Sequence, residues 1–190
     1  LHREILTSAT WRQSTSASKE AQQRDPSNQW LSHMNRKRLD FEAWRDAMLF
    51  VSCDLDLQGG GPSKLLSDKT NHRRTLYATV HRREMSKTLQ IHDFPDPTQH
   101  SPKRSSTVTA LQGLYALNGP LLADQSKKLA KRLNADSKSN QARVRHAYRL
   151  LFSREPSQRE LKLGLAFLAG PSGKHSSEAV WQQYAHVLLA

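Results

Sequence analysis

Residues 107–120 read TVTALQGLYALNGP and contain both the start and the end of one helix. Thr109 followed by Gln112 has the form of a capping box, in which the hydroxyl accepts from the third backbone N–H and the glutamine side chain reaches back to the cap. The Asn-Gly-Pro tripeptide at 118–120 ends this helix and starts the next, because proline suits the first helical position, where its missing N–H costs nothing. The stretch therefore predicts two helices joined by a tight corner.

Downstream of this corner, apolar residues recur at helical spacing to the end of the chain. Ser157 with Glu160 forms a second capping box directly after Pro156. We therefore expect residues 105–190 to form a purely helical C-terminal half. The positions expected to face its core include Leu122, Leu129, Ala130, Leu133, Val144, Ala147, Tyr148 and Leu151.

The region before residue 105 mixes helical and extended patterns. Asp25 followed by Pro26 predicts a helix start, with the aspartate as N-cap. Asp40 opens a further helix, because the apolar residues after it recur at near-helical spacing. The expected core positions of that helix are Phe41, Trp44, Met48 and Val51.

Two segments of this region resemble β-strands. Residues 73–84 read RRTLYATVHRRE, in which Leu76, Ala78 and Val80 would point to one side of a strand. Residues 88–94, TLQIHDF, show a second and shorter alternation. Together they predict a small antiparallel pair.

The predicted fold class is therefore mainly α, a helical domain with a small antiparallel β element near residues 73–92. We expect a single domain over residues 1–190, with the β element in an N-terminal half, 1–104, and helices in the C-terminal half, 105–190. Because the chain opens on Leu1 and its last apolar run has no cap, we expect it to be excerpted from a larger multidomain protein.

Composition narrows the function class without naming a function. With 190 residues, of which 36% are hydrophobic, the chain is long enough to bury a core. Its net charge of +12 is spread over both halves, which favours solubility and weak attraction to polyanions rather than one binding surface. No run of 18 apolar residues predicts a membrane span, and no targeting segment is recognisable.

Metal, cofactor and catalytic motifs are also missing from the sequence. Cys53 is the one cysteine, which excludes an internal disulfide, a paired-cysteine zinc site and a Cys-x-x-Cys-His haem attachment, and it is expected to be a small buried hydrophobe. No Gly-x-Ser-x-Gly elbow marks a nucleophile. We therefore predict no cofactor in this stretch and leave catalytic residues unassigned. A metal hypothesis would gather His72, His81, His92, Asp93, Asp96 and His100, but their spacing does not support a site.

A dense polar loop, residues 93–104, precedes the opening stretch. Its prolines stiffen an irregular backbone and cannot donate to a sheet, so other contacts must hold it. We interpret this loop as a binding or structural clasp in which Asp93 and Asp96 accept from Arg104, Arg73 or Arg74. An alternative interpretation makes His92–Arg104 the site of an extracytoplasmic enzyme or a metal-dependent module.

Basic and aromatic residues leave a further alternative open. The basic segments beside aromatic residues permit weak binding to polyanions or nucleic acid through distributed charge, although no known nucleic-acid-binding motif is present. Exposed tryptophans would suit stacking on sugar rings, but their helical positions favour the core. The four tryptophans are Trp11, Trp30, Trp44 and Trp181.

The chain resembles a known family at TSATWRQ (7–13), MNRKRLDFEAWRDAML (34–49), RRTLYATVHRRE (73–84), DFPDP (93–97), STVTALQGLYALN (106–118) and AYRLLFSREPSQREL (147–161). It is similar to domain of unknown function 1553, the C-terminal module of large planctomycete-type surface proteins that often carry a cytochrome c-like domain. Ser101 and Ala110 stand where the family often has cysteine and proline. The resemblance implies an extracytoplasmic location at the periplasm or cell surface, a multidomain parent, and haem c, if any, elsewhere in that parent.

These observations favour a non-catalytic interaction or scaffold module of a large extracytoplasmic protein. Its expected partners are other domains of the same polypeptide, with surface polysaccharide or an acidic protein as further candidates. Nucleic acid is not favoured, because base-reading elements are missing and the implied location is outside the cytoplasm.

Overall fold

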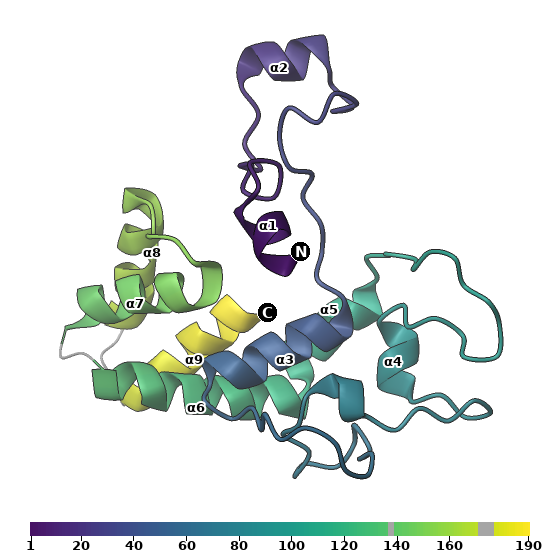
Figure 1. The fold of residues 1–190 in the computed structure, drawn as a ribbon. Helices are drawn as coiled ribbons and strands as arrows, with labels where there is room; N and C mark the ends of the chain where they lie inside the picture. The colour runs from purple at the N-terminus through teal and green to yellow at the C-terminus, as the bar shows by residue number, and fades with distance from the viewer. Residues whose placement is uncertain (137–138, 171–176) are drawn as a thin grey trace. The chain divides into compact units, whose positions relative to one another are not determined.

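The computed structural model describes residues 1–136, 139–170 and 177–190, and within these ranges the chain is mainly helical (Figure 1). The predicted fold class is confirmed in this respect. The elements are α1 (His2–Thr7), α2 (Lys19–Arg24), α3 (Phe41–Val51), the 3₁₀ helix η1 (Thr75–Tyr77), α4 (Lys87–Ile91), α5 (Ala110–Asn118), α6 (Pro120–Asp136), α7 (Asn140–Phe152), α8 (Gln158–Ala169) and α9 (Ser177–Leu189).

Contacts divide the chain into two compact units, Leu1–Arg38 and Leu39–Ala190. Each unit is described by itself below. The expectation of one domain over residues 1–190 stays a prediction, because compactness and independent folding are different properties.

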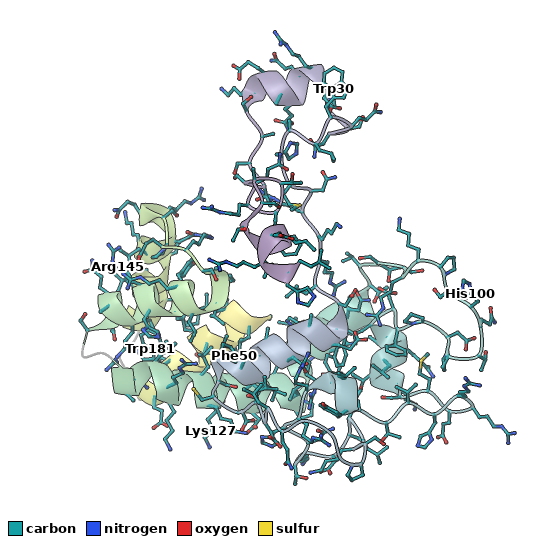
Figure 2. The ribbon with its side chains drawn as sticks, viewed as in Figure 1. Trp30, Phe50, His100, Lys127, Arg145 and Trp181 are labelled. Atoms are coloured by element: carbon teal, nitrogen blue, oxygen red, sulfur yellow. The ribbon has the colours of Figure 1, made fainter. Side chains whose placement is uncertain are left out.

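Helices α6 to α9 and the end of α3 enclose the hydrophobic core of the larger unit. Helix α6 packs along α9, and α7 packs on α8. Trp181 is almost fully buried among these helices (Figure 2). The predicted core positions are confirmed for Phe41, Met48, Val51, Leu122, Leu129, Ala130, Leu133, Val144, Ala147 and Tyr148, while Trp44 and Leu151 are half-buried at its edge.

Both predicted capping boxes are present, so local signals account for where α5 and α8 begin. Thr109 accepts from the backbone of Gln112, whose side chain accepts from the cap, and Ser157 and Glu160 repeat the arrangement. The corner between α5 and α6 requires glycine, because a Cβ at Gly119 would overlap the backbone carbonyl of Tyr115.

The prediction of a small antiparallel β element near residues 73–92 was wrong. No sheet occurs in the described ranges, and this region contains η1, α4 and two isolated parallel bridges, Asp56 with Arg73 and Lys64 with Ala78. The alternating apolar residues fail as a strand because no layer covers them: Leu76 is 72% exposed. Polar contacts decide the local backbone instead, since the N–H and Oγ1 of Thr75 both donate to Asp46, at 2.7 and 2.6 Å.

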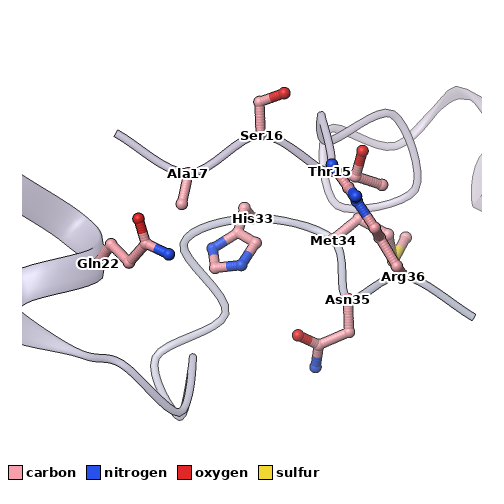
Figure 3. A pocket seen from close by; sticks show the side chains of 8 residues that line it. All are labelled: Thr15, Ser16, Ala17, Gln22, His33, Met34, Asn35 and Arg36. Carbon is pink, nitrogen blue, oxygen red and sulfur yellow. The ribbon is translucent and has the colours of Figure 1, made fainter. Parts of the chain in front are cut away.

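The smaller unit has no apolar core, since its two buried side chains, Asp25 and Asn28, are both polar. The helix start expected at Asp25 was wrong: the aspartate follows α2, and its carboxylate accepts the backbone N–H of Trp30. A polar groove of about 450 Å³ lies between the 15–17 segment, α2 and the 33–36 segment (Figure 3). In the described part of the chain, no helix is both long and apolar enough to cross a bilayer.

Candidate functional site

A cavity of about 650 Å³ lies in the larger unit between α3, the 66–72 loop, α5 and α6. Its size is that of an ordinary small-molecule site. The apolar lining comprises Phe41, Leu49, Leu66, Pro120 and Leu121, and the polar lining includes Arg45, Asn71, His72, Asp124, Gln125 and Lys128.

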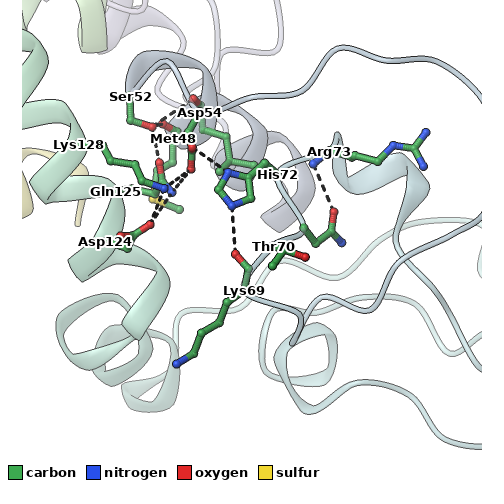
Figure 4. A network of polar contacts seen from close by, with 12 residues as sticks. Met48, Ser52, Asp54, Lys69, Thr70, His72, Arg73, Asp124, Gln125 and Lys128 are labelled. Carbon is green, nitrogen blue, oxygen red and sulfur yellow. Dashed lines mark hydrogen bonds and ion pairs between the residues drawn. The ribbon is translucent and has the colours of Figure 1, made fainter.

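Asp54, directly after α3, is the centre of a polar network at this cavity (Figure 4). Its carboxylate accepts from Lys128 Nζ and Gln125 Nε2, both at 2.7 Å, and from His72 Nδ1 at 2.8 Å. Lys128 also pairs with Asp124 at 2.7 Å, one helical turn away. The network therefore joins α6 to Asp54 and, through it, to His72. These two residues lie near the two ends of the irregular segment between α3 and η1. Cys53, just before the network, is exposed with a positive φ, so its expected burial was wrong.

The charges of this network stabilise each other. Burial alone would raise the pKa of Asp54, but the hydrogen bonds from Lys128, Gln125 and His72 outweigh it and hold that pKa below its ordinary value. Burial likewise opposes the charge of Lys128, yet its bonds to Asp124 and Asp54 raise its pKa. Both groups are therefore charged over the whole neutral range.

Two buried arginines hold the irregular segment that follows. Arg45, only 3% exposed, donates to the carbonyl of Arg73 at 2.9 Å, to the carbonyl of Asn71 and to Thr75 Oγ1 at 3.1 Å. Arg73 donates in turn to the carbonyl oxygens of Pro62, Gln58 and Gly60. These donors replace the ladder that a sheet would have supplied.

The geometry of the network is that of a structural anchor. His72 Nε2 lies 3.1 Å from the carbonyl oxygen of Lys69 while Nδ1 faces Asp54, so both ring nitrogens are engaged. Both polar atoms of the Gln125 side chain are engaged as well: its Nε2 donates to Asp54, and its Oε1 accepts from Ser52 Oγ. A general base must reach a substrate proton, which His72 could do only by releasing one of these two contacts.

The histidines of the metal hypothesis are dispersed. His92 lies within an aromatic box, with its ring centroid 4.5 Å from that of Phe41 and 4.8 Å from that of Tyr115, and its Nδ1 is 2.7 Å from the carbonyl oxygen of Thr88. His81 and His100 are exposed. Across residues 1–136, 139–170 and 177–190, no three His, Cys, Asp or Glu side chains are grouped as a metal would require.

Arg104 ties the polar loop to α3. Its guanidinium donates to both carboxylate oxygens of Glu42, at 2.9 and 2.6 Å, and Asp40 lies 3.3 Å away. The bond from Arg104 lowers the pKa of Glu42 against the opposing effect of burial. The same guanidinium lies over the Phe94 ring, 5.1 Å from its centroid. This acceptor, Glu42, differs from the aspartates that the sequence suggested.

The remaining residues of the expected clasp have separate places. Asp93 accepts from the N–H of Thr107 at 2.8 Å, from Thr107 Oγ1 at 2.7 Å and from Gln112 Nε2 at 3.2 Å, so it joins the loop to the start of α5. Asp96 is exposed and accepts from Thr98 within its own turn. Arg73 holds the 58–62 segment, and Arg74 is exposed beside it. A clasp role for the loop itself stays a prediction.

We expect the double-mutant cycle of Arg104→Ala and Glu42→Ala to give a coupling energy of about 1–2 kcal/mol, as is usual for directly bonded side chains. Both residues are 26% exposed, which limits screening by solvent. The measurement is urea denaturation of the four proteins. The matched cycle of Arg104→Ala with Asp96→Ala should give a coupling near zero, and the reverse ranking would restore the partner that the sequence suggested.

Glu42, Asp46 and Asp54 were missed by sequence reasoning. Each lies on α3 or just after it, where an acidic residue is an ordinary feature of a helix surface. One signal was available: Asp46 lies between the predicted core positions Trp44 and Met48, and Asp54 comes three residues after the last of them. Their partners, however, lie up to 74 residues away along the chain.

Helix α5 carries an apolar surface outside the cavity. Leu111, Leu114 and Leu117, here called the leucine stripe, are 60%, 53% and 62% exposed. The opposite side of the same helix buries Gln112, which donates to the carbonyl of Ile91 at 2.9 Å and belongs to the capping box. Helix α5 thus directs its three leucines outward, while Gln112 and Tyr115 face inward, whereas the leucines of an ordinary surface helix face the core.

The comparison with known proteins agrees with the resemblance seen in the sequence. No curated protein and no solved structure matches the chain. The model of one family, PSD1, described as protein of unknown function (DUF1553), matches residues 1–168. Since that range covers most of the 190 residues, including α1 to α7 and nearly all of α8, the chain belongs to the PSD1 family of proteins of unknown function, DUF1553.

Proposed function

We propose that the chain is a non-catalytic interaction module that docks through the leucine stripe of α5 against another domain of the same polypeptide. The observation that carries this proposal is the orientation of α5, which exposes Leu111, Leu114 and Leu117 while it buries Gln112. Exposing three leucines on one helix face has a cost in water that a docked partner would remove. The polar network at the cavity supports the same assignment, because its charged groups are engaged in structural contacts.

The size of the stripe favours a tethered partner. Three partly exposed leucines, even with the exposed Val108 beside them, offer far less than the roughly 800 Å² per partner that a stable free-standing interface buries. A partner within the same polypeptide needs less area, because the linker holds it at an effective concentration on the order of millimolar. A second domain of one chain therefore suits the stripe better than a separate protein.

The proposal also covers where the protein is located and whether this chain binds a cofactor. The resemblance to planctomycete-type surface proteins supports an extracytoplasmic location and a multidomain parent. In this proposal the chain carries no cofactor, and any haem c is bound by another domain. The dispersed histidines and the exposed, single Cys53 are consistent with this division.

Replacing the stripe with glutamine separates docking from folding. We expect the triple variant Leu111→Gln, Leu114→Gln, Leu117→Gln to change the free energy of unfolding by no more than about 0.5 kcal/mol per site, since exposed positions contribute little to the core. The matched control is the fully buried Leu122→Ala, which should cost about 2–5 kcal/mol. Urea denaturation of the isolated chain measures both. A triple variant that is destabilised as strongly as the control would make the stripe part of the core and overturn the proposal.

A further inference from the structure

The smaller unit presents a tryptophan to solvent at the tip of a loop, residues 25–35. Trp30 is 77% exposed, and its neighbour Leu31 is 58% exposed (Figure 2). Tryptophan is on average a highly buried residue, so a ring this exposed needs an explanation. The expectation that Trp11 and Trp30 belong to the core was wrong, because this unit has no apolar core to receive them, and Trp11 is 54% exposed.

Buried polar side chains hold the loop in shape. Asp25 accepts the N–H of Trp30 at 2.8 Å, which fixes the backbone at the tip. Asn28, 4% exposed, donates to the carbonyl of His33 at 2.7 Å and to Asn35 Oδ1 at 3.0 Å, and its own oxygen accepts from Ser32 Oγ. The loop is therefore built around two polar residues and keeps its shape without using the Trp30 ring.

The backbone of this loop has positive φ angles on both sides of Trp30. Asn28 and Leu31 have φ values of 51° and 52°, and a leucine in this left-handed region is uncommon. Gln13 Nε2 donates to the carbonyl of Leu31 at 2.8 Å and holds that conformation. The strain of a leucine in this region persists only where the surroundings enforce it, and it is typical of sites where a side chain must be held in place.

The polar groove belongs to the same loop. Its walls include Gln22, Arg36 and, from the loop itself, His33 and Asn35, the two residues that Asn28 contacts (Figure 3). Among its lining residues, all within the described part of the chain, there is no carboxylate. Residues 1–38 hold seven Lys and Arg against three Asp and Glu, one of which is the buried Asp25. The groove therefore offers amide, imidazole and guanidinium groups in a positive field.

We propose that the 25–35 loop and its groove bind an acidic polysaccharide, with the Trp30 ring stacked on a sugar ring. The flat indole supplies the apolar contact for a sugar face, the amides of Gln22 and Asn35 can bond hydroxyl groups, and Arg36 can pair with a sulfate or carboxylate substituent. The groove takes His33 and Asn35 from the loop that carries Trp30, and its polar lining fits a polyhydroxylated ligand better than an apolar protein surface or the interior of a bilayer. This inference extends beyond docking through α5 and uses a different unit of the chain.

Trp30→Ala in the full chain tests the proposal against the general attraction of a +12 protein to polyanions. Binding through distributed charge weakens steeply as the salt concentration rises, so all affinities are measured at about 0.2 M salt to suppress it. The probes are heparin, polygalacturonate and neutral dextran, and the binding of each is measured by titration calorimetry. We expect an acidic probe to bind the parent protein more tightly than dextran, and Trp30→Ala to weaken that binding about tenfold, as the loss of one stacked aromatic would.

Two further variants and one further probe decide the outcome. Phe50→Ala, which removes an exposed aromatic side chain of the other unit, should bind as the parent does. Arg36→Gln should lose the preference for acidic over neutral probes. Equal binding by the parent and Trp30→Ala would reduce the interaction to distributed charge and overturn the proposal. No binding of any polysaccharide, or Trp30-dependent binding to vesicles of anionic lipid alone, would overturn it as well.

Discussion

Arg45→Met is expected to lower the free energy of unfolding by about 3–5 kcal/mol, because two buried carbonyl groups lose their charged donor and each unsatisfied group costs about 1–3 kcal/mol. The guanidinium is 3% exposed and donates to two backbone carbonyls, of Asn71 and Arg73, and to the hydroxyl of Thr75. Methionine retains most of the volume and none of the donors, so both carbonyls are left buried without a partner. Urea denaturation with far-ultraviolet circular dichroism measures the change.

Arg74→Met is the matched control for this variant. Arg74 lies next to Arg73 in the same segment, but it is exposed, so its loss should change stability by less than about 0.5 kcal/mol. Similar losses for Arg45→Met and Arg74→Met would mean that general charge, and not the buried donors of Arg45, holds the irregular segment.

Asp54→Asn is expected to cost about 2–3 kcal/mol, because hydrogen bonds to an ionised group are the stronger ones. An asparagine keeps the shape but turns an N–H group toward Lys128, Gln125 or His72, each of which is a donor in the network. Asp124→Asn is the matched control. Asp124 is 54% exposed and bonds chiefly Lys128, so its loss should be smaller.

The cost of Asp54→Asn should depend on pH. The folded-state pKa of Asp54 lies below its ordinary value of 3.8, so its contribution to stability is fully present above about pH 5 and is lost as the pH falls through the folded pKa. The stability difference between the parent and the variant should therefore be constant near neutral pH and should narrow below about pH 4. A difference that stays constant down to pH 2 would show that the carboxylate charge does not contribute.

The helical part of the fold was predictable because its signals are local. A capping box needs residues three positions apart, as at Thr109 and Gln112, and an apolar stripe needs one helix only. The core of α6 followed from the same reasoning, and Leu129 and Leu133 are fully buried.

The segment between α3 and α5 was not predictable because its partners are distant and polar. Arg45 meets Thr75 across 30 residues, and Asp54 meets Lys128 across 74. No periodicity marks such pairs, and the alternation around Leu76 then suggested a strand that the surroundings do not cover. Contacts of Arg104 were hidden for the same reason: the sequence indicated that Arg104 pairs with a carboxylate, but not that this carboxylate is Glu42.

The orientation of α5 was hidden from the sequence for a different reason. A leucine stripe on a helix ordinarily predicts the buried face, and Gln112 was recognised only as part of a cap. The structure shows that the same glutamine also bonds the carbonyl of Ile91 and so fixes which side of α5 faces inward. This contact and the packing of Tyr115 against Phe41 and His92 hold one side of α5 inward, so Leu111, Leu114 and Leu117 face outward.

Photo-crosslinking from position 114 tests the docking role of the leucine stripe most directly. Leu114 is replaced by p-benzoylphenylalanine in the whole polypeptide as the cell makes it, and the crosslinked peptides are identified by mass spectrometry. We predict a crosslink to another domain of the same polypeptide that disappears when Leu111→Gln and Leu117→Gln are added, and no such crosslink from Leu76, which is 72% exposed but lies outside the stripe. No crosslink from position 114, or a crosslink only to a separate protein, would contradict the proposed function.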